Sequence, residues 1–197
     1  MIGPRVKIKT LGVFVGPGDL EVDNWQPRID AVEKVLSSWR QWYLSFKGKA
    51  LVINALPLSR VWYVASLMYM PDWVTLKLVR LAFHFFWGGK CELVCRSVVV
   101  QPPDKGGFSV VDVQQKFSSL LVQWVRHSIS SHANCSHFLT FWFFSYFNCS
   151  VLDVFSQTFA FSPLALPPFC QSLLLSWPSV NGSFSASRSS GYGFFIV

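Results

Sequence analysis

A long apolar run from Ala50 to Met70 constrains the fold of this 197-residue chain more than any other feature. Arg60 is its one charged residue, which is typical of a helix that is buried on most of its sides. Pro57 lies near the middle, and a proline inside a helix removes a backbone donor and clashes with the preceding turn, at a cost of about 3 kcal/mol. The run therefore predicts two buried helical pieces, near residues 46–56 and 58–69, with Ser45 as the N-cap of the first.

Amphipathic segments flank this run on both sides. Before it, Asp23 or Asn24 can cap a helix that has Pro27 in its first turn. After it, a helix begins at Pro71 and ends at two glycines. The expected buried faces are Trp25, Ile29, Val32, Leu36 and Trp39 in the first helix, and Trp73, Leu76, Val79, Phe83 and Phe86 in the second. These segments predict a mainly α fold, a helical bundle.

Shorter elements accompany the bundle. Lys7 to Val15 predicts a short N-terminal β-strand closed by a turn, and the β-branched residues from Val94 to Gln101 predict another strand. Pro102 to Gly107 reads as a loop, and Asp112 can cap a helix that runs to about Ile129. The expected organisation is a strand in residues 1–20, a helical module in 21–90, a strand, loop and helix in 91–130, and a tail in 131–197.

Charge divides the chain unevenly. The formal net charge is +7, which favours polyanions as partners, nucleic acid first and anionic membranes second. After Arg126, the only Lys, Arg, Asp or Glu residues are Asp153 and Arg188. The tail is rich in Phe, Ser, Trp and Pro, and its weak periodicity predicts irregular or partly disordered structure. Its most apolar segment, Phe138 to Phe147, is too short to span a bilayer of about 30 Å.

The sequence contains no recognisable catalytic or metal-binding motif. No nucleophile elbow, P-loop or Asp-Asp pair occurs, so we expect no catalytic residues and no cofactor. His132, Cys135 and His137 lie close together, but no Cys-x-x-Cys pair accompanies them, so we expect no metal site. The odd number of cysteines and the absence of an apolar segment behind the first basic residues predict an intracellular location, in the nucleus or cytoplasm.

Basic residues alternate with aromatic residues in the first half of the chain. Lys and Arg side chains bind phosphates, and backbone N–H groups at a helix start add positive partial charge beside Lys47 and Lys49. We therefore expect non-specific binding to the backbone of RNA, DNA or an RNA/DNA hybrid. The candidate residues are Arg40, Lys47, Gly48, Lys49, Arg60, Lys77, Arg80 and Lys90. An equally weighted interpretation is that the aromatic residues form the core and the charges only solubilise it.

A series of short motifs occurs in one order along the chain. They are Lys9-Thr10-Leu11-Gly12-Val13, Asn24-Trp25, Leu44-Ser45-x-Lys47-Gly48-Lys49-Ala50, Ile53-Asn54, Leu58-Ser59-Arg60-x-Trp62-Tyr63, Pro71-x-Trp73, Phe85-x-Trp87-x-Gly89-Lys90 and Pro102-x-x-Lys105-Gly106-Gly107-Phe108. This order resembles the open reading frame 2 protein of LINE-type (non-LTR) retrotransposons, in the segment that follows the reverse-transcriptase palm. The resemblance covers about residues 5–126.

The resemblance implies that the strand near Lys9 is the last palm element and that the helices from Trp25 to Trp87 form the thumb. In such enzymes the thumb holds the RNA template and DNA primer. The palm's catalytic acids would precede Lys9, where the sequence holds eight residues, so the resemblance implies a non-catalytic fragment. Pro57 and Cys95 depart from the expected pattern. Two alternatives remain: a small membrane-associated protein whose aromatic C-terminal third inserts in a bilayer, and a genomic relic without function.

Overall fold

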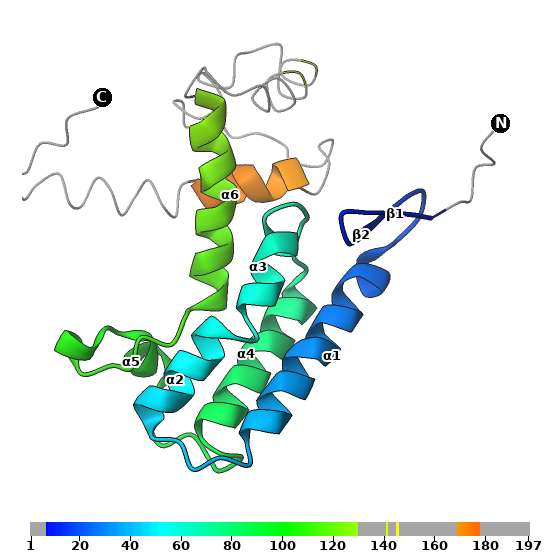
Figure 1. Ribbon diagram of the computed structural model, residues 1–197. Helices are drawn as coiled ribbons and strands as arrows, with labels where there is room; N and C mark the ends of the chain where they lie inside the picture. The colour runs from blue at the N-terminus through cyan, green and yellow to red at the C-terminus, as the bar shows by residue number, and fades with distance from the viewer. Residues whose placement is uncertain (1–6, 130–140, 142–144, 146–168, 178–197) are drawn as a thin grey trace, which may run out of the picture. The chain divides into compact units, whose positions relative to one another are not determined.

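The computed structural model describes residues 7–129, 141, 145 and 169–177, which carry colour in Figure 1. Helices predominate among them, and a small antiparallel sheet stands at the N-terminal end, so the predicted mainly α fold class is confirmed. The chain divides into two compact units, Met1–Lys116 and Phe117–Val197. The helices of the predicted bundle all belong to the first unit.

The N-terminal segment is a β-hairpin and not the single strand that the sequence predicts. Strand β1 (Ile8–Thr10) pairs with β2 (Val13–Val15) in antiparallel register, with Ile8 opposite Val15. Leu11 and Gly12 form the two-residue turn, and both have positive φ, 51° and 80°. Two such residues suit the hairpin turns whose twist matches that of the strands. Both paired strands therefore lie within the segment from Lys7 to Val15.

Helix α1 (Glu21–Trp39) begins earlier than predicted. The carboxylate of Asp19 accepts a hydrogen bond from the backbone N–H of Glu21 at 2.9 Å, so the first turn is held from outside the helix. Pro27 consequently lies inside the helix and not in its first turn. The predicted buried face is confirmed for Trp25, Ile29, Val32 and Leu36, whereas Trp39 is only half-buried.

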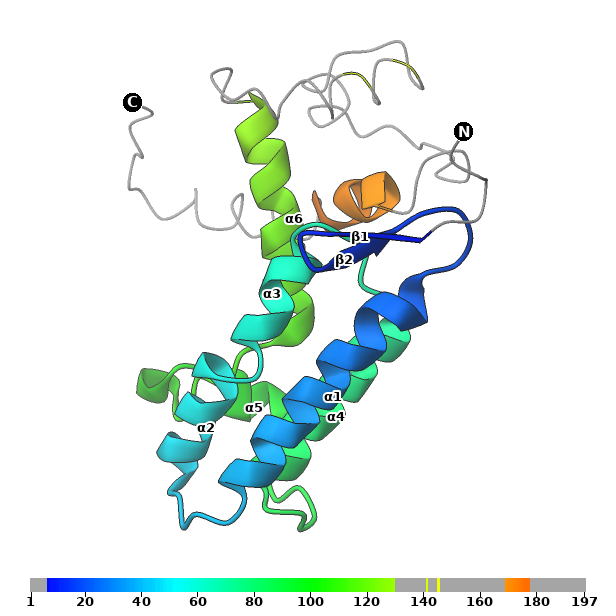
Figure 2. The same cartoon turned by 45° about the vertical axis from the view of Figure 1, so that its right-hand side comes forward.

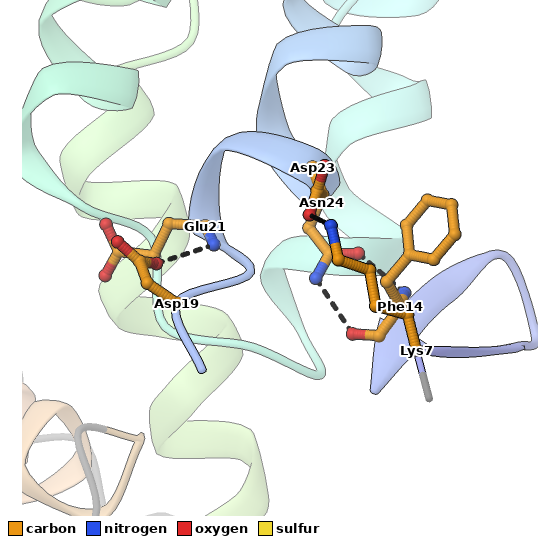
Figure 3. A network of polar contacts seen from close by, with 6 residues as sticks. All are labelled: Lys7, Phe14, Asp19, Glu21, Asp23 and Asn24. Atoms are coloured by element: carbon orange, nitrogen blue, oxygen red, sulfur yellow. Dashed lines mark hydrogen bonds and ion pairs between the residues drawn. The ribbon is translucent and has the colours of Figure 1, made fainter. Parts of the chain in front are cut away.

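Asn24 does not cap the helix as predicted but binds the backbone of the hairpin. Its side chain is fully buried, accepts a hydrogen bond from the N–H of Phe14 at 2.7 Å and donates one to the carbonyl of Phe14 at 2.9 Å. Figure 3 shows this pair of bonds between α1 and the hairpin, next to the ion pair of Lys7 with Asp23. Arg28 donates to the carbonyl of Gly12 at the hairpin turn. The hairpin is thus fixed to α1 by polar contacts to its backbone.

Pro57 divides the long apolar run as predicted. Helix α2 (Phe46–Ala55) ends two residues before it, and helix α3 (Ser59–Ala65) begins two residues after it. The second piece is shorter than the expected 58–69. The interior of the run is deeply buried, with Ile53, Leu58 and Val61 each at 1% exposure or less.

Helix α4 (Asp72–Phe86) lies beside α1 over its whole length in both views (Figures 1 and 2). The indole of Trp25 donates to the carbonyl of Tyr69, so the two helices start at the same level and run parallel. The predicted buried face is partly wrong, because Leu76 is 64% exposed while Val74 and Leu78 are fully buried. Since α4 contacts both α1 and α2, its buried face includes positions that a single periodic stripe omits.

The predicted strand from Val94 to Gln101 is wrong. Residues Arg96–Val100 form a short helix, α5, which the 3₁₀ helix η1 (Pro103–Lys105) follows. Strand propensity depends on a neighbouring strand, and β1 and β2 pair only with each other. The segment closes on itself instead: Phe108 donates to the carbonyl of Val99 at 3.0 Å.

Gly107 makes this closure possible, since a Cβ at this position would lie 1.9 Å from the carbonyl oxygen of Gln101.

Helix α6 (Val113–Ile129) has the predicted bounds, and Asp112 caps it by accepting from the N–H of Gln115 at 3.1 Å. In the C-terminal third, residues 169–177 are helical, which corrects the irregular structure predicted there. Most of residues 131–197 lie outside the described residues. Within the described part of the chain, no helix combines the length and apolar character that crossing a membrane requires.

Candidate nucleic-acid interface

Three helices of the first unit bring their ends together on one side. The connection from α1 to α2 and the residues that follow α4 lie at the same end of the bundle in both views (Figures 1 and 2). We call this the basic end and define it by four cations: Arg40 at the C-terminus of α1, Lys47 and Lys49 in the first turn of α2, and Lys90 after α4. Arg40, Lys47 and Lys90 are exposed, and Lys49 is half-buried.

The C-terminus of α4 ends in two glycines that leave space for a cation. Gly88 and Gly89 both have positive φ, and their N–H groups donate to the carbonyls of Phe85 and His84, at 3.0 and 2.8 Å. This is the hydrogen-bond pattern of a Schellman motif, in which glycine takes the left-handed conformation. A Cβ on Gly89 would lie 2.4 Å from Nη2 of Arg40, so the glycine also makes room for the guanidinium.

Lys49 joins α2 to α4. Its ammonium donates to the carbonyl of Phe86, in the last turn of α4, at 3.1 Å, and it lies 5.5 Å from the centre of the Phe46 ring. A positive charge at a helix C-terminus is favourable because the final carbonyls carry negative partial charge. Lys49 therefore stabilises the bundle, and its two remaining N–H donors can still face an anion.

The N-terminus of α2 supplies backbone donors at the same end. The hydroxyl of Ser45 accepts from the N–H of Gly48 at 3.2 Å, which confirms the predicted cap. The N–H groups of Phe46 and Lys47 belong to the first turn, where an α-helix provides no acceptor of its own. Positive partial charge from the helix start thus adds to the charge of Lys47.

Aromatic rings support and flank the basic end. Phe46, Phe86, Trp87 and Phe108 form a cluster in which Phe46 and Phe86 lie 5.1–5.7 Å, centre to centre, from each other and from the other two rings. Trp42 and Tyr43 are not part of it: they lie in the connection after α1 and are 67% and 107% exposed. Large exposed rings next to cations are a feature of surfaces that bind nucleic acid.

Two hollows open at this end. The larger, of about 210 Å³, lies between the α1–α2 connection and α4. Its lining residues are Trp39, Arg40, Trp42, Tyr43, Leu44, Lys49, Phe85 and Gly88. The smaller, of about 90 Å³, lies between α1 and α4 and includes Glu33, Arg40 and His84. Nη2 of Arg40 is 3.4 Å from Nε2 of His84, and Arg40 lines both hollows.

The structure therefore brings together Arg40, Lys47, Gly48, Lys49 and Lys90 of the predicted site residues. Arg80 lies on α4 about 6 Å along the axis from His84, and Lys77 lies one turn further. Arg60 is on α3, beyond α2, whose ten residues span about 15 Å. His84 was missed by the prediction, although it follows Arg80 by four residues and so shares a helical face with it.

Three cysteines lie in the described part of the chain: Cys91, Cys95 and Cys170. Among the described residues, no three His, Cys, Asp or Glu side chains lie close enough to hold a metal ion. Cys91 and Cys95 are exposed thiols. Hydrogen bonds from the side chain and backbone of Ser97 lower the pKa of Cys95. The predicted grouping of His132, Cys135 and His137 lies outside the described residues.

No protein-family model matches the chain. A search of curated proteins finds similarity to the transposon TX1 uncharacterized 149 kDa protein of Xenopus laevis, with 31% identity over 124 residues, which is 60% of this chain. The match spans 9% of the length of that relative. The similarity relates the chain to a short part of a transposon protein.

Proposed function

We propose that the chain is a non-catalytic, thumb-like part of a LINE-type reverse transcriptase and that its basic end binds the phosphate backbone of an RNA/DNA template–primer. One observation carries the proposal: cations from three separate elements, Arg40, Lys47, Lys49 and Lys90, meet at one end of the bundle. The collinear motifs and the similarity to a transposon protein support the family part of the proposal.

The chemistry of this end suits phosphate oxygens. Guanidinium and ammonium groups are hydrogen-bond donors only. The backbone N–H groups in the first turn of α2 also point out of the helix at its N-terminus, where an anion can bind them. Such contacts fix a nucleic acid in place without reading its sequence. The proposed binding is therefore independent of sequence and sensitive to salt.

The roles of the acidic side chains support a non-catalytic part. Asp19 and Asp112 hold helix N-termini, Asp23 pairs with Lys7, and Glu92 pairs with Arg96. Nucleotidyl transfer requires carboxylates that together hold two metal ions. Polymerase activity from the 197-residue chain alone would contradict this part of the proposal.

The binding is tested by measuring the affinity of the full chain for an RNA/DNA hybrid across a salt series. The logarithm of the association constant should fall linearly with the logarithm of salt, with a slope of roughly −3.6 for four phosphate contacts. The triple variant Arg40→Gln, Lys47→Gln, Lys90→Gln should reduce the magnitude of this slope by about 2 to 3. Lys49 is left unchanged because it also holds α2 to α4.

The matched control is the triple variant Lys9→Gln, Lys34→Gln, Lys105→Gln, which removes the same charge from exposed positions outside the basic end. It should change the slope by less than about 1. Equal losses in the two triple variants would reject the basic end as the binding surface. An affinity that does not depend on salt would reject backbone binding altogether.

A further inference from the structure

We propose that the 210 Å³ pocket at the basic end holds one unpaired nucleotide, with its base stacked on Trp42 and Tyr43 and its phosphate at Arg40 and Lys49. This inference rests on the proposed function and adds a substrate feature to it: a single-stranded end or overhang beside the duplex. The argument depends on the size of the pocket, its rings and its charges.

The size of the pocket suits a small, flat ligand. Pockets for drug-sized molecules measure about 300–1,000 Å³, and this one, at about 210 Å³, is smaller. It is also open to the surface through the exposed rings of Trp42 and Tyr43. A single base can enter such a pocket, whereas a base pair inside a duplex cannot.

The rings are placed for stacking by the local backbone. The N–H of Trp42 donates to the carbonyl of Trp39 at 3.2 Å, so the chain turns sharply as α1 ends. Trp39, Trp42 and Tyr43 all line the pocket at this turn, and Phe85 of α4 lines it as well. Every base has a π-face, so stacking on aromatic rings tolerates any sequence. A base pair inside a duplex has both faces covered by its neighbours, whereas an unpaired base can leave the stack and insert between the rings.

The charges in the pocket select an anionic ligand. Among the described residues that line it, Arg40 and Lys49 carry a charge, and both are positive. Lys49 is held by the carbonyl of Phe86, which fixes its ammonium at the pocket and lowers the entropy lost on binding. A neutral aromatic ligand would leave these cations without a counter-ion. A nucleotide satisfies both the rings and the cations.

The test compares two RNA/DNA hybrids that bind the full 197-residue chain: one with blunt ends and one with a three-nucleotide overhang that carries 2-aminopurine. The overhang hybrid should bind about tenfold more tightly, and the fluorescence of 2-aminopurine should fall as the base stacks. In Trp42→Ala and in Tyr43→Ala this preference for the overhang should fall from about tenfold to about threefold or less.

Tyr63→Ala is the matched control, because Tyr63 is a half-exposed tyrosine on α3 that does not line the pocket. It should keep the tenfold ratio. Trp42→Leu retains the apolar bulk and is used with circular dichroism to separate a loss of stacking from a loss of folding. In a folded variant, it too should lose the preference.

The outcomes distinguish this inference from the proposed function. Equal, salt-dependent binding of both hybrids by the unchanged chain would overturn the unpaired-nucleotide site and leave backbone binding intact. Binding of neither hybrid would overturn both. A preference for the overhang that survives in Trp42→Ala and Tyr43→Ala would overturn the pocket as its location.

Discussion

Two asparagines hold neighbouring backbone segments against the helices. Asn24 of α1 binds both backbone groups of Phe14, and Asn54 of α2 donates to the carbonyl of Ser109 at 2.8 Å and accepts from the N–H of Val111 at 3.0 Å. An asparagine side chain has the donor and acceptor of a peptide group, so it can replace a neighbouring strand. The sequence showed both residues but predicted a capping role for Asn24.

We expect Asn24→Ala to lower the free energy of unfolding by about 2 to 3 kcal/mol, because it leaves a backbone donor and acceptor of Phe14 without partners. Urea denaturation followed by circular dichroism measures the change. Gln26→Ala is the control, since its side chain only bonds to Asp30 on the surface, and it should cost less than about 0.5 kcal/mol. If the unchanged chain shows no cooperative transition at all, the genomic-relic interpretation gains support.

At the scale of elements, several helix ends followed from local sequence, although α1 begins earlier than predicted and α5 replaces a predicted strand. Ser45, Pro57, Gly88 and Asp112 fix helix ends through contacts within a few residues. A strand needs a partner, and none of the described strands pairs with the segment from Val94 to Gln101. For this reason the β-branched segment from Val94 to Gln101 became a helix, while the N-terminal strand paired with its own continuation.

The contact of Lys49 with α4 leads to a prediction about the two lysines of α2. Lys49→Met should lower the free energy of unfolding by about 1.5 kcal/mol, because it removes a charged donor from the last turn of α4. Lys47→Met should change it by less than about 0.5 kcal/mol, since Lys47 is exposed. Thermal or urea unfolding of both variants measures this difference. Equal effects would show that Lys49 does not join the helices in solution.

At the scale of the whole molecule, the uneven distribution of charge is compatible with two classes of partner, nucleic acid and membranes. The basic first unit can attract any polyanion, and the membrane alternative assigns insertion to the aromatic C-terminal third. Electrostatic attraction is screened by salt, whereas burial of aromatic side chains in a bilayer is not. The salt dependence of lipid binding therefore separates the two.

We expect the full chain to float with vesicles that contain anionic lipid at low salt and to be released at about 0.5 M salt, where the Debye length is roughly 4 Å. Vesicles of neutral lipid, as the control, should not bind it. Flotation that persists at high salt, or with neutral lipid, would favour the membrane-associated alternative over the nucleic-acid interpretation.

The sequence by itself determined the mainly α fold, the division of the apolar run at Pro57, the caps at Ser45 and Asp112, the glycine end of α4, and the identity of the cations. These features depend on backbone sterics and local hydrogen bonds, which act over a few residues. Only the tertiary structure decided which cations meet. Arg40 and Lys49 flank one short connection, whereas Lys90 follows two further helices, and the packing of α4 against both α1 and α2 brings these cations to one end while Arg60 stays apart.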